Sequence, residues 1–221
     1  MASQVSQAAL NSQKTMAISK LVAKQLGNPT GIFSKLAAWI WNRRNAALND
    51  TVLALLSFEP TDRVLDIGFG GGYLLDRMAE RVTTGCLAGV DISPAMVAEA
   101  QKRYKIMIRS GILELKCASA EALPYPDLHF SKVCSVNSIF YWQDVEKGLH
   151  EMQRVLERNG KAVVCFTEKG SLEPKGFARQ IKLFESGDIN QLLRQSGFRE
   201  TQVYSSQDPY RQYTCITARR I

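Results

Sequence analysis

Apolar residues recur along this chain with two different periods. Short continuous apolar runs, typical of buried strands, alternate with segments in which apolar residues stand three and four positions apart, as on one face of a helix. The runs predict strands over residues 64–67, 86–90, 113–116, 132–136, 162–167, 198–204 and 213–218. The alternation predicts an α/β fold with a doubly wound, seven-stranded sheet whose last two strands form a C-terminal antiparallel hairpin.

Three further segments with helical spacing precede the first strand, at residues 14–26, 32–41 and 48–56. We expect residues 1–44 to form N-terminal lid helices or an appendage, and residues 45–221 to form one domain, because such a sheet is already covered by its own crossover helices. Residues 1–26 leave an alternative open, since they lack acidic residues as a targeting segment does, but they also lack arginine.

The first strand runs into a glycine-dense turn, Val64–Tyr73, with the sequence VLDIGFGGGY. A strand, a tight turn and a helix in this order are typical of a nucleotide site. The dinucleotide fingerprint G-x-G-x-x-G would use Gly68 and Gly70 but fails at its third position, which is Tyr73. Asp66 would repel a pyrophosphate and attract a ligand that carries an ammonium and a sulfonium. S-adenosylmethionine carries both of these charges. Tyr73, where the fingerprint fails, and Asp66 together disfavour a nicotinamide oxidoreductase.

A second acidic residue, Asp91, ends the next predicted strand, 25 residues beyond Asp66. Ser93 and Pro94 favour the start of a helix directly after it, as N-cap and first helical residue. A carboxylate in this position is typical of an acid that holds ribose hydroxyls, in dinucleotide and S-adenosylmethionine sites alike. Asp91 therefore supports a nucleoside ligand, and only together with Asp66 does it favour S-adenosylmethionine.

Three segments resemble the class I S-adenosylmethionine-dependent methyltransferases, in that family's order: DIGFGGG at 66–72, ASAEALPYPD at 118–127 and LERNGK at 156–161. The second is similar to the family segment G-D-A-E-x-L-P-F-x-D, but Ser119 stands where the family generally has Asp. The resemblance implies a Rossmann-like sheet and S-adenosylmethionine as cofactor. It also implies cofactor contacts from Asp66, Gly68, Gly70, Asp91, Ile92, Met96, Ser119, Ala120, Glu121 and Asn137. A serine accepts a hydrogen bond from the adenine amino group without charge, so we expect backbone groups at Ala120 and Glu121 to contribute more.

The acceptor is expected beside the aromatic residues that follow the fourth strand. Such rings can steady a sulfonium by cation–π attraction and hold a flat or apolar molecule, although a hydrophobic plug under a loop is the alternative. The candidate substrate residues are Trp41, Asn45, Asn49, Phe140, Tyr141 and Trp142, with packing or capping as the alternative for the first three. Tyr141 is the candidate catalytic base, needed only if the acceptor starts protonated.

The nature of the acceptor is constrained by a motif that is absent. Amide-directed amino methyltransferases resemble one another in an Asn/Asp-Pro-Pro-Tyr sequence after the fourth strand, and here Asp208-Pro209-Tyr210 falls in a late turn instead. The nearest resemblance is to the ubiquinone/menaquinone-biosynthesis-like, methyltransferase type 11 group. It implies methyl transfer to an oxygen, nitrogen or carbon atom of a small molecule. The alternatives are an RNA or protein methyltransferase, or a non-catalytic cofactor-binding partner subunit.

Charge and composition exclude few further classes. The net charge of +7 is spread as an excess of four in residues 1–60, none in 61–167 and three in 168–221. A nucleic-acid site would gather lysines and arginines among aromatic residues, so we do not expect nucleic-acid binding. No apolar run approaches 18 residues, so we expect no membrane span. The sequence leaves the oligomeric state open.

The cysteines bear on compartment and metal binding. There are five, at positions 86, 117, 134, 165 and 215, widely spaced and without a CxxC pair. Because four of them lie in apolar runs, we expect buried thiols in a reducing, cytoplasmic environment. With only two histidines in the chain, we expect no metal site.

Overall fold

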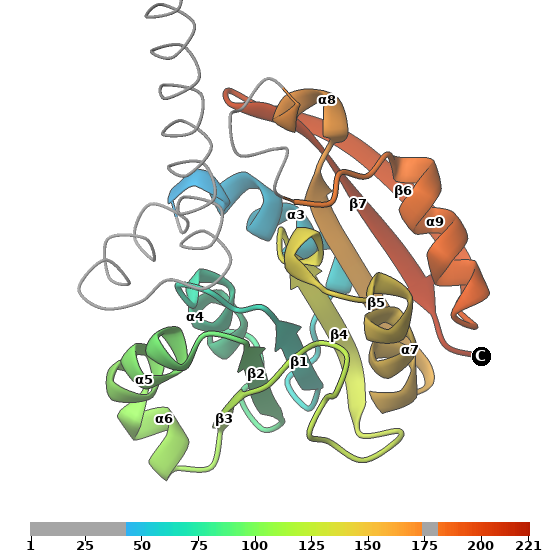
Figure 1. The fold of residues 1–221 in the computed structure, drawn as a ribbon. Helices are drawn as coiled ribbons and strands as arrows, with labels where there is room; N and C mark the ends of the chain where they lie inside the picture. Colours follow the sequence, from blue (N-terminus) through green and yellow to red (C-terminus); the bar gives the residue numbers. More distant parts are fainter. Residues whose placement is uncertain (1–42, 174–180) are drawn as a thin grey trace, which may run out of the picture.

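The computed structural model describes residues 43–173 and 181–221, and Figure 1 shows their arrangement. Seven strands form one sheet in the order β3-β2-β1-β4-β5-β7-β6. The strands are β1 (Arg63–Ile67), β2 (Cys86–Asp91), β3 (Leu113–Cys117), β4 (Phe130–Val136), β5 (Leu156–Thr167), β6 (Arg199–Asp208) and β7 (Arg211–Arg219). The helices are α3 (Ala46–Leu56), α4 (Tyr73–Ala79), α5 (Pro94–Arg103), α6 (Lys105–Arg109), the 3-10 turn η1 (Ile139–Tyr141), α7 (Val145–Val155), α8 (Lys169–Leu172) and α9 (Ser186–Gln195).

The sheet confirms the predicted fold class. Strands β1 to β5 are parallel, and β7 pairs antiparallel with both β5 and β6. The parallel strands run upward in Figure 1, so their carboxyl ends meet along the upper edge. The chain order reverses between β1 and β4, which creates the crevice in which open α/β sheets bind ligands. Asp66, near the end of β1, lies opposite Gly89 of β2 and Cys134 of β4.

Two hydrophobic clusters cover the two faces of the sheet. Successive side chains of a strand point to opposite faces, so Val64 joins one cluster while Leu65 and Ile67 join the other. Helices α3, α4 and α5 pack on the face of Val64, and α7 and α9 pack on the opposite face. Helix α3 contacts β4, β5 and β7, so it is part of the core.

Helix α7 stops earlier than its local sequence suggests. An Asn-Gly pair such as Asn159-Gly160 is typical of a helix end, but α7 ends at Val155 and β5 begins at Leu156. Arg220 explains the early end, because its guanidinium donates to the carbonyls of Gln153, Arg154 and Leu156 at 2.7 to 2.9 Å. These bonds satisfy carbonyls that a helix end leaves unpaired. A contact 64 or more residues distant in sequence therefore decides where the helix stops.

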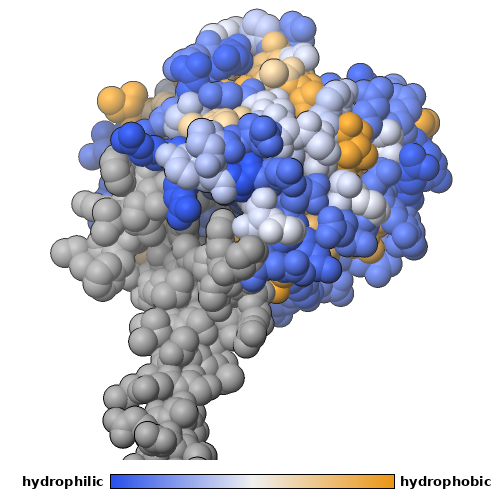
Figure 2. All heavy atoms as spheres, turned by 90° about the horizontal axis from the view of Figure 1, so that it is seen from above, coloured by the Kyte–Doolittle hydropathy of each residue, from blue (hydrophilic) through white to orange (hydrophobic). Residues whose placement is uncertain are grey.

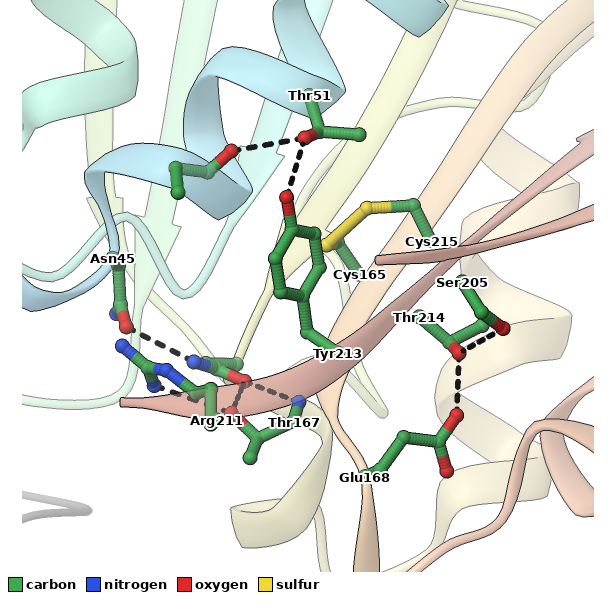
Figure 3. The surroundings of a disulfide bond; sticks show 12 residues. Asn45, Thr51, Cys165, Thr167, Glu168, Ser205, Arg211, Tyr213, Thr214 and Cys215 are labelled. Carbon is green, nitrogen blue, oxygen red and sulfur yellow. Dashed lines mark hydrogen bonds between the residues drawn. A yellow bond between two sulfur atoms is a disulfide. The ribbon is translucent and has the colours of Figure 1, made fainter. Parts of the chain in front are cut away.

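The cysteines do not match the expectation. Cys165 of β5 and Cys215 of β7 stand directly opposite each other in the antiparallel pair and form a disulfide (Figure 3). Of the three free cysteines, only Cys134 is buried, and Cys117 is exposed. The expectation of five buried thiols is therefore wrong, and the inference of a cytoplasmic location loses the cysteine argument on which it rested.

Candidate functional site

A cavity of about 370 Å³ opens at the carboxyl edge of the sheet, the edge that Figure 2 views from above. Of the sequence-predicted site residues, fifteen line this cavity: Asn45, Asn49, Asp66, Gly68, Gly70, Asp91, Ile92, Met96, Ser119, Ala120, Glu121, Asn137, Phe140, Tyr141 and Trp142. The sixteenth, Trp41, lies outside the described residues, as does nearly all of the expected lid, residues 1–44. The surface around the edge is mostly hydrophilic, with a few separate hydrophobic spots (Figure 2).

The glycine turn is held tightly against its neighbours. Gly68 has a φ of +77°, and a Cβ there would collide with Ser138 at the end of β4. Its N–H donates to the carbonyl of Val90 at 2.7 Å. Gly72 has a φ of +76°, and its carbonyl accepts a hydrogen bond from the Tyr104 hydroxyl at 2.9 Å. The turn therefore needs glycine for both conformation and space, and it lies where the ends of β1, β2 and β4 meet.

Asp66 is a buried carboxylate with little to compensate its charge. The residue lines the cavity and is 2% exposed. Among the described residues, the one hydrogen-bond donor to its carboxylate is the Cys134 thiol, at 3.9 Å. Burial, and to a smaller extent the Asp91 carboxylate, raises the pKa of Asp66 to about 7. A cationic group in the cavity would supply the missing partner and return this pKa toward its usual range.

Asp91 is fixed by backbone donors and still has room for more. One carboxylate oxygen accepts the Ser93 N–H at 2.9 Å and the other accepts the Gly70 N–H at 2.9 Å. Burial raises the pKa of Asp91, and these two hydrogen bonds oppose the rise. Each oxygen keeps a lone pair, which suits the two vicinal hydroxyls of a ribose. Ser93 also caps α5, as expected from the sequence.

Ser119 and Glu121 form a local pair that the sequence did not predict. The Ser119 hydroxyl donates to the Glu121 carboxylate and accepts the Glu121 N–H at 3.3 Å. The other Glu121 oxygen accepts the Asp144 N–H at 3.2 Å. The Ser119 hydroxyl therefore orients the Glu121 carboxylate, which lies at the cavity wall and which the family segment also carries.

Asn137 links three elements at the other end of the cavity. Its amide nitrogen donates to the Asn45 side chain at 3.0 Å, and its amide oxygen accepts from the backbone and hydroxyl of Thr167 at 2.8 and 3.1 Å. Asn137 has a φ of +52°, a conformation that asparagine tolerates better than most residues. Asn45 is therefore engaged with Asn137, while Asn49 is buried on α3 with its side chain at the cavity.

The aromatic residues after β4 play different structural parts. Phe140 stacks on Phe184, with ring centroids 6.5 Å apart, and lies edge-on to Tyr141. The Trp142 indole N–H donates to Ser138 at 3.1 Å, and its ring fills the space that a side chain at Gly148 would occupy, so Trp142 belongs largely to the core. Burial raises the pKa of Tyr141 to about 12, which keeps its phenol protonated at neutral pH and argues against a role as general base.

Comparison with known proteins places the chain in a family. A family model described as "Methyltransferase domain" matches residues 65–164. An uncharacterized methyltransferase of Bacillus subtilis, YdaC, is 31% identical over 150 residues, which cover 66% of this chain and 81% of YdaC. The chain belongs to the class I S-adenosylmethionine-dependent methyltransferases. This confirms the resemblance drawn from the sequence, the enzyme class and the cofactor.

Other proteins that this methyltransferase resembles share less of its sequence, and the two solved structures among them show a likeness of fold. The O-methyltransferase resE of Aspergillus sclerotiorum is 27% identical over 167 residues, which cover 72% of this chain and 62% of resE. A chain from the complex of the Haloferax volcanii Trm112 methyltransferase activator with its methyltransferase has a TM-score of 0.72 at 17% identity, over 85% of this chain and 95% of that one. Phosphoethanolamine N-methyltransferase 2 of Haemonchus contortus, solved with S-adenosyl-L-methionine, has a TM-score of 0.65 at 18% identity, over 79% and 52%.

The residues of this methyltransferase suit its cofactor. Asp66 is a buried, poorly compensated carboxylate, and Ile92 is an aliphatic side chain that stays 46% exposed where it lines the cavity. The first suits an ammonium and the second suits the flat face of an adenine. Within the described ranges, the cavity included, no group of three or more His, Cys, Asp or Glu side chains is placed to hold a metal ion, and no helix is long and apolar enough to cross a membrane.

Sequence reasoning missed five residues at the end of the cavity that lies beyond β4. Thr167, Leu172, Ile181, Arg44 and Arg211 line it. Thr167 could have been found, because it ends a predicted strand and ligands lie at such ends. No local pattern marks Arg44 or Arg211, since the first lies just before α3 and the second begins the last strand.

Proposed function

We propose that this methyltransferase methylates a small molecule bound in the half of the cavity that lies beyond β4. The observation that carries the proposal is the lining of that half, to which Phe140, Tyr141, Leu172 and Ile181 contribute apolar surface. An apolar wall in a small cavity suits a small, partly apolar acceptor better than an RNA strand or a protein segment.

The relatives support the same acceptor class. They include the O-methyltransferase resE and a 2-methyl-6-phytyl-1,4-hydroquinone methyltransferase of Arabidopsis thaliana. The chain covers 62% and 34% of the length of these two relatives, so their substrates are guides to a class of compound only.

For the cofactor half we propose one role for each polar group. Asp66 receives the ammonium of the methionine part, Asp91 the two ribose hydroxyls, and Glu121, oriented by Ser119, the adenine amino group. Ile92 and Met96 flank the adenine, and Gly68 and Gly70 let the backbone approach the ligand closely. Glu121 thus takes over, with its side chain, the contact that the sequence suggested for backbone groups.

For the acceptor half we propose that the chain positions the nucleophile and excludes water. When bound, S-adenosylmethionine would supply an electrophilic methyl carbon, whose bond to sulfur breaks as the acceptor's nucleophile bonds to it in line, with S-adenosylhomocysteine as the leaving group. Asn137, fixed by Asn45 and Thr167, holds the wall between the two halves. Phe140 and Tyr141 provide an aromatic surface that holds the acceptor in position for the in-line reaction. Tyr141 acts as a hydrogen-bonding phenol there, because its pKa is too high for a base.

Transfer of a radiolabelled methyl group tests the acceptor class. The full chain is incubated with methyl-tritiated S-adenosylmethionine and a cell extract that has been separated into small molecules, RNA and protein. Label in the small-molecule fraction, absent with Asp66→Ala protein, is expected. Enzyme-dependent label only in RNA or protein would refute the proposal and favour the corresponding alternative.

A further inference from the structure

The charged groups that line the cavity are divided between its two ends. Three carboxylates, Asp66, Asp91 and Glu121, lie over β1, β2 and the segment after β3. Two arginines, the exposed Arg44 and the largely buried Arg211, line the end formed by α3, β5 and β7. Since the sheet order is β3-β2-β1-β4-β5-β7, the positive end lies beyond β4, on the acceptor side.

Arg211 is held in place by the hairpin turn from which it comes. Asp208 accepts the backbone N–H groups of Tyr210 and Arg211 at 2.8 and 2.9 Å with one oxygen, and the other oxygen accepts the Arg211 Nε–H at 3.4 Å. The guanidinium also donates to the Thr167 hydroxyl at 3.2 Å and to the carbonyl of Arg44. Figure 3 shows the Arg211 side chain beside Thr167 and Asn45. The group is therefore preorganised at the cavity wall.

Arg211 forms an ion pair with the buried Asp208 carboxylate, and its hydrogen-bonding capacity is only partly used. Its side chain is 10% exposed, and burial lowers the pKa of the guanidinium, an effect that Asp208 opposes and Arg44 reinforces. The three hydrogen bonds use one N–H each, so one N–H on each terminal nitrogen has no partner in the described part of the chain. Arg44 adds a second positive charge, and its guanidinium lies over the Tyr210 ring at 5.9 Å.

We propose that Arg211, assisted by Arg44, binds an anionic group of the acceptor, a carboxylate or a phosphate, while the apolar part of the acceptor lies on Phe140, Leu172 and Ile181. A planar guanidinium that keeps one unpaired N–H on each terminal nitrogen, on a side chain only 10% exposed, is suited to such an oxyanion. The acceptor is then an amphiphile with its charge fixed away from the attacking atom. The inference rests on the proposed small-molecule acceptor.

Matched anionic and neutral probes test the subsite. The full chain, with and without saturating S-adenosylhomocysteine, is titrated calorimetrically with benzoate, benzamide and phenyl phosphate. We expect at least one of the two anions to bind about tenfold more tightly than benzamide, or more. We expect Arg211→Met to abolish this difference in affinity. Arg211→Lys should retain part of it. Arg219→Met is the matched control, because it removes the same charge from the far end of the same strand, and it should leave the preference unchanged.

Four results separate the proposal from its rivals. Equal or absent binding of the anions and benzamide by the wild type would overturn the subsite while leaving methyl transfer intact. A loss of S-adenosylhomocysteine affinity in Arg211→Met, with anion preference kept, would make Arg211 a ligand of the cofactor carboxylate and would overturn the proposal. Anion preference in a chain that binds no S-adenosylhomocysteine would keep the subsite and refute the proposed function. If Arg211→Met lowers the melting temperature, Arg44→Met should still weaken anion binding about threefold, and no change there would count against the subsite.

Discussion

Replacing Asp66 by asparagine should remove a pH dependence from cofactor binding. Asp66 is buried at the cavity wall with a pKa of about 7, so a large share of the ligand-free protein carries a neutral carboxyl group near neutral pH. An ammonium binds well only against the ionised form. S-adenosylhomocysteine should therefore bind the wild type more tightly as the pH rises through 7, and Asp66→Asn weakly at every pH.

The size of the effect follows from the fraction of Asp66 that is ionised. For a pKa of about 7, that fraction is roughly 3% at pH 5.5 and roughly 90% at pH 8. If only the ionised form binds, the affinity rises about thirtyfold over this range, or about 2 kcal/mol.

The Asp66 carboxyl group should lower the stability of the ligand-free protein as the pH rises, while cofactor affinity increases. The folded pKa of about 7 lies above the ordinary value of 3.8, so the folded chain holds the proton more tightly than the unfolded chain. The stability of the ligand-free wild type should therefore fall as the pH rises from about 4 to about 7, by at most about 4 kcal/mol. Asp66→Asn, which has no proton to lose, should be the more stable protein at pH 8.

Calorimetric titration with S-adenosylhomocysteine at pH 5.5, 6.5, 7.2 and 8.0 measures the first effect, and urea unfolding at the same pH values measures the second. Glu200→Gln is the control, because it removes a carboxylate that is 62% exposed on β6, away from the cavity. Equal wild-type affinity at pH 5.5 and 8.0, or the same pH dependence in Asp66→Asn, would refute the reasoning.

Three further predictions concern the rest of the site. Asp91→Ala should lower S-adenosylhomocysteine affinity by about 1.5 to 3 kcal/mol in calorimetry without unfolding the chain, and an unchanged affinity would remove Asp91 from the site. Glu121→Gln should weaken S-adenosylhomocysteine about tenfold but hardly affect the inosine analogue, which lacks the adenine amino group; equal losses for both ligands would contradict the adenine contact. Deleting residues 1–44, the proposed lid, should leave a folded domain that binds S-adenosylhomocysteine within about tenfold but no longer transfers label, because acceptor positioning and water exclusion are lost. Insoluble protein, or full transfer after the deletion, would contradict the lid.

The sequence predicted the sheet and the gathering of Asp66, Asp91 and Glu121 at one cavity because both follow from local patterns. Each strand has its own apolar run, and Asp66, Asp91 and Glu121 all lie at or shortly after the carboxyl end of a strand. Parallel strands bring their carboxyl ends to one edge of the sheet, independently of the conformation of the loops. The position of these groups at one cavity is thus a consequence of strand direction.

The parts that the sequence did not predict depend on contacts between distant segments. Arg211 reaches the cavity because β7 inserts beside β5, and the disulfide joins residues 50 positions apart that happen to pair in register. The end of α7 is fixed by Arg220. In each case the decisive partner is set by strand order, which apolar periodicity alone does not specify. The pKa of Tyr141 likewise depends on burial that no motif encodes.

A crystal structure with S-adenosylhomocysteine tests most directly the claim that the cavity is divided into a cofactor half and an acceptor half. The account predicts the ammonium at Asp66, the ribose hydroxyls at Asp91 and the adenine amino group at Glu121. It also predicts that the sulfur points past Asn137 toward an open space bounded by Phe140 and Arg211. A ligand lying the other way, with its carboxylate on Arg211 and its adenine against Phe140, would contradict it.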